Sequence, residues 1–203
     1  MLNSTSAFSQ IQIPYNRNVW IVGIVRETGL MGDFSSKSAI EHRQQAPNRI
    51  CCAVLTVSDT RKPENDRGGQ AICQLLHESG HAVELYQIVP DEPGPLTMVV
   101  QQSVAQVAID AILVTGGTGI ALRDQTPDTI ENLYTKTLPG YGELFRMLSY
   151  QEIGSAALLS RASGGLIDRT VVLTMPGSPA AVRLAMEKLI LPELAHLVEQ
   201  ARR

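Results

Sequence analysis

The residues best suited to chemistry form a glycine-rich segment in the middle of the chain. An apolar run over residues 112–114 leads into Thr115-Gly116-Gly117-Thr118-Gly119, and Arg123-Asp124 follows. Glycines let the backbone turn tightly and approach a ligand with exposed N–H groups. The segment therefore predicts an anion-binding loop that carries a carboxylate, Asp124, at its edge.

A helix is expected directly after this loop. Thr126 can cap it, Pro127 suits its first position and Asp128 its first turn. The positive end of the helix dipole favours a phosphate at such a site. A Walker A loop would need a lysine after the glycines, and a dinucleotide fingerprint would need a glycine in place of Leu122. A strand-to-helix turn without a ligand is the alternative explanation.

Alternating strand and helix patterns from residue 49 onward predict the elements that position this loop. We expect strands over residues 50–57, 83–89, 111–114 and 171–174. We expect a helix capped by Asp66, a helix over residues 96–107 with Val107 on its apolar face, two or more helices between residues 126 and 163, and a final helix over residues 179–200. This order predicts an α/β fold with a mostly parallel sheet and helices on both faces.

Polar and glycine-rich segments follow the expected strands. They are Ser58-Asp59, Asp91-Glu92, the glycine segment and Pro176-Gly177-Ser178-Pro179. In parallel sheets ligands bind beyond the carboxyl ends of the strands, so these segments should meet. Asp91 and Asp124 could then hold Mg²⁺ together with substrate phosphates and support phosphoryl transfer. Each could instead be a turn or capping residue.

Other residues could add to an anion site at this edge. Ser178 is a suitable cap for the last helix, whose N-terminus would open on the same edge. Three arginines could hold anions through paired hydrogen bonds, or could be ordinary surface residues. They are Arg123, Arg146 and Arg161.

The composition excludes several classes of protein. The 203-residue chain carries a net charge of −3, no basic run and 4% aromatic residues, which argues against a nucleic-acid partner. Three cysteines without a Cys-x-x-Cys pair indicate a reducing cytoplasm, and four histidines without ligand spacing argue against structural zinc. The apolar segment over residues 19–25 is too short to span a membrane and lacks a cleavage pattern, so no membrane partner is expected.

The first part of the chain reads differently from the rest. Residues 1–48 are rich in Ser, Asn and Gln and show no sustained period, which predicts a mostly disordered extension. A single domain is expected over residues 49–203. A true start at Met31 is the other explanation of this segment.

Six short motifs carry a resemblance to a known family. They are Thr56-Val57-Ser58-Asp59, Val89-Pro90-Asp91-Glu92, the segment from Thr115 to Pro127, Pro139-Gly140-Tyr141-Gly142-Glu143, Ser160-Arg161-Ala162 and Pro176-Gly177-Ser178-Pro179. In this order they resemble the molybdenum cofactor biosynthesis proteins MoaB and MogA, a family also found as a domain of gephyrin. The segment from His42 to Pro47 resembles the lead-in of the MoaB branch, which favours Met31 as the start.

The resemblance implies a three-layer α/β/α fold and an activity. The family assembles as a trimer, or as a hexamer in the MoaB branch, and adenylylates molybdopterin with ATP and Mg²⁺, releasing pyrophosphate. The protein that inserts molybdate would be a further partner. Asp91 and Asp124 would be catalytic and hold Mg²⁺. The resemblance places at the substrate Ser58, Asp59, Asp66, Gly69, Thr115, Gly116, Gly117, Thr118, Gly119, Arg123, Thr126, Glu143, Pro176, Gly177 and Ser178.

One departure from the family concerns the start of the first helix. The family usually has Asp-x-Ser-Gly where this chain has Asp66-Arg67-Gly68-Gly69, so a hydroxyl is lost at the expected pocket. Such a loss weakens a ligand hydrogen bond by about 1 kcal/mol. Three functions stay open at this point: an adenylyltransferase, a molybdopterin-binding or carrier protein without catalysis, and an unrelated nucleotide-binding domain. The choice between a molybdenum and a tungsten pathway also stays open.

Overall fold

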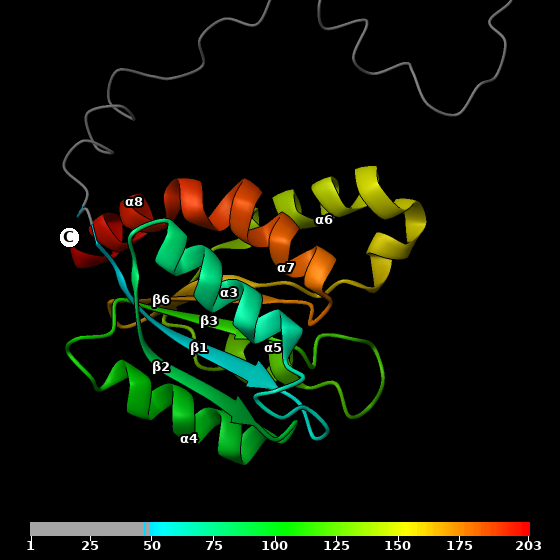
Figure 1. Ribbon diagram of the computed structural model, residues 1–203, viewed down its shortest axis with the longest axis horizontal. Helices are drawn as coiled ribbons and strands as arrows, with labels where there is room; N and C mark the ends of the chain where they lie inside the picture. Colours follow the sequence, from blue (N-terminus) through cyan, green and yellow to red (C-terminus); the bar gives the residue numbers. More distant parts are fainter. Residues whose placement is uncertain (1–46, 48) are drawn as a thin grey trace, which may run out of the picture. The chain divides into compact units, whose positions relative to one another are not determined.

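Figure 1 shows the computed structural model, which describes residue 47 and residues 49–203. The described residues fall within one compact unit, Glu41–Arg203. The expected extension over residues 1–48 and the start at Met31 lie outside the described residues, apart from Pro47. The domain boundary at residue 49 therefore stays a prediction.

A six-stranded sheet with strand order β2-β1-β3-β6-β5-β4 forms the middle layer. Four strands run parallel: β2 (Ala82–Val89), β1 (Cys51–Val57), β3 (Ala111–Thr115) and β6 (Thr170–Met175). The other two are antiparallel to their neighbours: β5 (Gly164–Ile167) and β4 (Lys136–Thr137). The predicted mostly parallel sheet is confirmed. The two antiparallel strands were missed because they are short and β5 begins with two glycines.

Helices cover both faces of the sheet, so the central strands are apolar on both sides. On β1, Cys52 and Val54 face one core and Ala53 and Leu55 face the other, and all four are fully buried. Figure 1 shows α3 and α7 on one side of the sheet and α4 on the other. The first core contains residues of α3 (Arg67–Glu78), α6 (Pro139–Ile153), α7 (Pro179–Ala185) and α8 (Leu191–Arg202), and the second contains residues of α4 (Pro93–Val104) and α5 (Thr126–Glu131). This is the expected three-layer α/β/α fold.

The predicted bounds of α4 were wrong. The helix starts three residues early, at Pro93, because proline fits the first turn of a helix, and it ends at Val104. Val107 lies beyond that end and is fully exposed, so it does not belong to the apolar face. That face is formed by Leu96, Val99 and Val100.

The predicted final helix is interrupted. A π-helical turn, η2 (Met186–Ile190), separates α7 from α8. Pro192 follows this turn and lacks the N–H that a regular helix needs, which is a common cause of such irregularities. A short 3₁₀ helix, η1 (Gly154–Leu159), follows α6. Over the part of the chain that the structure describes, no helix is both long and apolar enough to cross a membrane.

Asp110 joins three segments at the amino ends of the strands. It lies directly before β3, and its Oδ2 accepts the backbone N–H of Cys51 at 3.0 Å. Its Oδ1 accepts a hydrogen bond from Arg202 at the end of α8. The end of α8 is therefore bound at the amino ends of the strands, whereas the glycine loop follows the carboxyl end of β3.

Candidate functional site

Four loops start at the same edge of the sheet because the strand register brings their ends level. Val57 of β1 pairs with Val89 of β2, Thr56 of β1 with Thr115 of β3, and Thr115 in turn with Met175 of β6. The polar segments that follow these strands are therefore neighbours, as the sequence predicted.

A cavity of about 530 Å³ lies between these loops, and we call it the loop cavity. Its volume is within the range of small-molecule sites, about 300–1,000 Å³. Ten of the predicted site residues line it: Ser58, Asp66, Thr115, Gly116, Gly117, Thr118, Gly119, Asp124, Gly177 and Ser178. The structure thus brings together loops that are far apart in the sequence.

Both predicted catalytic carboxylates pack against the glycine loop. A Cβ added to Gly117 would lie 2.9 and 3.0 Å from the two carboxylate oxygens of Asp91. A Cβ added to Gly119 would lie 2.5 Å from Oδ2 of Asp124. The absence of side chains at these two glycines is what lets the carboxylates approach the same stretch of backbone.

Asp91 and Asp124 are close enough to feel each other's charge. Burial raises the pKa of Asp91, and the charges of Asp124 and Asp59 raise it further, while the Gln125 N–H and the Arg123 guanidinium act in the opposite direction. A cation bound between the two carboxylates would relieve their repulsion. In the described residues no group of three or more His, Cys, Asp or Glu side chains is arranged to hold a metal. The pair fits Mg²⁺ only if substrate phosphates supply further oxygens, as is usual for this ion.

An ion pair joins the glycine loop to the loop after β1. Arg123 Nε donates to Asp59 Oδ2 at 2.6 Å, and Asp59 Oδ1 accepts the Asp91 N–H at 3.2 Å. The hydrogen bond from Arg123 lowers the pKa of Asp59. Arg123 is thus engaged with a neighbouring loop, and its exposed position makes this pair a weak contributor to stability.

The N-terminus of α3 borders the loop cavity through its cap, Asp66. Asp66 caps it as predicted, since its Oδ1 accepts the Gly69 N–H at 3.0 Å. Its Oδ2 accepts the Tyr86 hydroxyl at 2.6 Å. The Thr56 hydroxyl lies beside Gly69 and has no hydrogen-bond partner within the described part of the chain, although Thr56 is only 4% exposed. The sequence did not single out Tyr86, because no motif includes it.

Thr56→Val tests whether that hydroxyl serves a ligand. A buried hydroxyl without a partner is costly, so its removal should leave the free energy of unfolding unchanged or raise it by about 1 kcal/mol. Binding of inorganic pyrophosphate, measured by calorimetry, should weaken about tenfold. Thr115→Val is the matched control, because the Thr115 hydroxyl donates to the Pro176 carbonyl and its loss should lower stability. Equal destabilisation by both substitutions would contradict this interpretation.

The two predicted helix caps at the loops have different outcomes. Ser178 caps α7, and its hydroxyl accepts the Ala181 N–H at 3.2 Å, as expected. The predicted cap of α5 was wrong by one residue, because Gln125 occupies the cap position and Thr126 is the first helical residue. The Thr126 hydroxyl instead lies against Gly117, buried and without a partner among the described residues.

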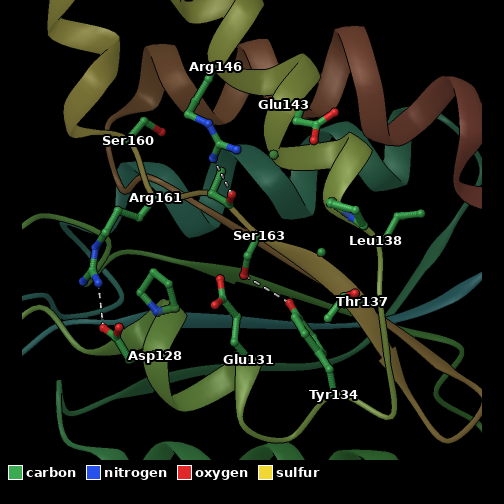
Figure 2. A pocket seen from close by; sticks show the side chains of 15 residues that line it. Asp128, Glu131, Tyr134, Thr137, Leu138, Glu143, Arg146, Ser160, Arg161 and Ser163 are labelled. Carbon is green, nitrogen blue, oxygen red and sulfur yellow. Dashed lines mark hydrogen bonds and ion pairs between the residues drawn. The ribbon is translucent and has the colours of Figure 1, made fainter.

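Glu143 lies apart from the other predicted residues. It lines a second cavity of about 610 Å³, which we call the Glu143 cavity (Figure 2). Figure 2 shows Arg146 and Arg161 on its wall, with Arg161 directed at Asp128. Arg146 Nη1 donates to the Ala162 carbonyl at 3.2 Å. The structure therefore does not bring Glu143 to the glycine loop, and its assignment to the substrate stays a prediction.

The comparison with protein families decides where this chain belongs. Residues 53–196 match the family described as probable molybdopterin binding domain, and this match spans the glycine loop and both carboxylates. The chain belongs to this family. Among its relatives is the molybdenum cofactor biosynthesis protein B of Bacillus subtilis, which is 51% identical over 167 residues, covering 82% of this chain and 98% of the relative.

Solved structures agree with this assignment. A crystal structure of a molybdenum cofactor biosynthesis protein B is 49% identical and superposes with a TM-score of 0.76, covering 78% of this chain and 99% of that one. The tungsten cofactor synthesizing protein MoaB of Pyrococcus furiosus is 35% identical with a TM-score of 0.71, covering 78% of this chain and all of that one. The predicted resemblance to MoaB and MogA is confirmed.

Proposed function

We propose that this protein acts in molybdenum cofactor biosynthesis as a molybdopterin adenylyltransferase. A phosphate oxygen of molybdopterin attacks the α-phosphorus of ATP, the bond from that phosphorus to the bridging oxygen breaks, and pyrophosphate leaves. The observation that carries this proposal is that the carboxylates of Asp91 and Asp124 pack against one glycine loop, which borders a cavity that the N-termini of α3 and α7 also line. Phosphoryl transfer depends mainly on positioning and charge neutralisation, which such a site can supply.

In the proposed reaction, carboxylates would bind the cation and backbone N–H groups would bind the phosphates. Asp91 and Asp124 hold Mg²⁺, which neutralises the phosphates of ATP when bound. The backbone N–H groups of the glycine loop and of the N-termini of α3 and α7 bind phosphate oxygens. The pair of Asp59 and Arg123 joins the loop after β1 to the glycine loop, and Thr56 offers the ligand its hydroxyl, which has no partner among the described residues.

A molybdopterin-binding or carrier protein is the second candidate, and Gly68 favours it. Because residue 68 is glycine, the junction of α3 and the loop after β6 carries no side-chain hydroxyl at this position, and an added Cβ would lie 3.1 Å from the Gly177 carbonyl oxygen. A carrier needs to hold the pterin and does not need to align it with a second substrate. The same fold would serve both functions.

Partners follow from the proposed reaction and the family. Molybdopterin and ATP are the proposed ligands, a trimer or hexamer is the proposed assembly, and the molybdate-insertion protein is a proposed recipient of the product. The reduced state of the three cysteines is compatible with a cytoplasmic location, which we also propose.

Pyrophosphate release is the experiment that tests the proposed function. The protein would be incubated with ATP and Mg²⁺, with and without molybdopterin, and pyrophosphate would be measured over time. Release that requires both molybdopterin and Mg²⁺ is the expected result. Tight molybdopterin binding without any release would reject the adenylyltransferase and favour the carrier.

A further inference from the structure

Arg161 holds the glycine loop from the side of the Glu143 cavity. Its Nε donates to the carbonyl oxygens of Gly119 at 2.8 Å and Thr118 at 3.4 Å. Its Nη2 donates to the carbonyl oxygen of Asp124, and its Nη1 pairs with Asp128 at 2.7 Å. All three guanidinium nitrogens are thus bonded to protein acceptors, which does not support the idea of Arg161 as an anion clamp.

These contacts fix the direction of the loop's N–H groups. In a trans peptide the carbonyl of one residue and the N–H of the next point in opposite directions. Since the Thr118 and Gly119 carbonyls point to Arg161, the N–H groups of Gly119 and Ile120 point away from it. Thr118 and Gly119 also line the loop cavity, so these N–H groups belong to a segment that borders the proposed anion site.

The same reasoning links Arg161 to Asp91 through one peptide group. Arg161 binds the carbonyl of Asp124, and the N–H of the same peptide belongs to Gln125. That N–H lowers the pKa of the Asp91 carboxyl. The Arg161 guanidinium therefore orients both the loop amides and the peptide group that carries this N–H.

The loop has few other attachments at its far end. Residues 116–125 contain no helix or strand, and Ile120 and Leu122 are 69% and 97% exposed. The bond from the Asp124 N–H to the Ala121 carbonyl is internal to the loop. The contact of Arg123 with Asp59 is exposed, whereas the side chain of Arg161 is 29% exposed and better shielded from water.

We propose that Arg161 is a positioning residue that holds the carbonyls of the glycine loop and so aligns the N–H groups of Gly119 and Ile120 for a polyphosphate in the loop cavity. Arg161 acts through the loop and does not touch the ligand. The identity of the anion rests on the proposed function, but the alignment can be measured without turnover.

Arg161→Met, which keeps an unbranched side chain of similar bulk, is the test. Hydrogen–deuterium exchange of peptides that cover residues 116–125 should become about tenfold faster, because three hydrogen bonds to loop carbonyls and the ion pair with Asp128 are lost. Binding of inorganic pyrophosphate with Mg²⁺ should weaken about tenfold in calorimetry. Arg161→Lys should recover part of both effects, since an ammonium group can bind some of the same carbonyls.

Two matched variants distinguish the positioning of the loop by Arg161 from a non-specific effect of removing a charged side chain at the Glu143 cavity. Arg146→Met removes an arginine from the same cavity wall whose guanidinium donates to the Ala162 carbonyl and to none of the glycine-loop carbonyls that Arg161 binds, so loop exchange should stay within about twofold of wild type. Asp128→Asn breaks the ion pair of Arg161 but leaves its three carbonyl contacts, and should also stay near wild type.

Three outcomes would overturn the proposal. They are unchanged loop exchange in Arg161→Met, exchange that rises equally in peptides of β1 and β3, and an Asp128→Asn variant that reproduces the full effect. The wild-type protein could show the expected exchange and binding results and yet release no pyrophosphate from ATP. That result would support the positioning role of Arg161 and reject the adenylyltransferase.

Discussion

Asp124→Asn is expected to lower pyrophosphate release at least about 100-fold, which corresponds to about 2.7 kcal/mol of transition-state stabilisation. An amide matches a carboxylate in shape but supplies no charge to Mg²⁺. The fold should persist, because Asp124 Oδ2 accepts the Ala121 N–H at 3.1 Å and an amide oxygen can accept the same bond. Initial rates at saturating ATP, together with the thermal midpoint, would measure both effects.

Asp168→Asn is the control for this substitution. Asp168 lies in the exposed turn between β5 and β6, and its φ of 53° is one that asparagine also tolerates. It loses the same unit of charge outside the loop cavity, so its rate should match wild type. Turnover that survives Asp124→Asn would remove Asp124 from the catalytic role.

Gly116→Ala is expected to destabilise the protein by at least about 3 kcal/mol, or to prevent folding. Gly116 has a φ of +98°, which L-residues rarely adopt. Its added Cβ would also clash with the Val57 carbonyl oxygen and lie 3.3 Å from the Val57 carbonyl carbon. Since both atoms belong to the backbone of β1, neither can move away cheaply. Urea denaturation followed by circular dichroism would measure the change.

Gly80→Ala separates the cost of the positive φ from the cost of the steric clash with β1. Gly80 also has a positive φ, +80°, but an added Cβ there would meet nothing within 4 Å. It should therefore cost only about 1 kcal/mol, from the backbone conformation alone. If Gly116→Ala cost no more than Gly80→Ala, the close approach of the glycine loop to β1 would not be rigid.

Most of the fold could be predicted from the sequence because the signals for its main elements are local. The apolar runs of β1 and β3 and the capping residues Asp66 and Ser178 predict their elements directly. β4 and β5 have no such signal, since they are stabilised by pairing with a neighbour rather than by their own pattern. The end of α4 was misplaced because valines at helical spacing continue beyond Val104.

The site was only partly predictable for a different reason. Motif residues at strand ends meet because parallel strands end together, which is a rule of topology. The contacts of Tyr86 with Asp66 and of Arg161 with the glycine loop join residues 20 and 42 positions apart, and no periodicity encodes them. Glu143 was grouped with the loop by resemblance, whereas the chain path places it in a separate cavity.

The tie between Arg202, Asp110 and Cys51 has a practical consequence for handling the protein. The last residue of α8 and the first residue of β1 both lie at the amino edge of the sheet, and the glycine loop lies at the carboxyl edge. A tag, a fused domain or a sensor surface attached at the C-terminus would therefore leave the mouth of the loop cavity open to ligand. Deleting the last two residues would instead remove the Arg202 contact and loosen the start of β3, at a distance from the chemistry.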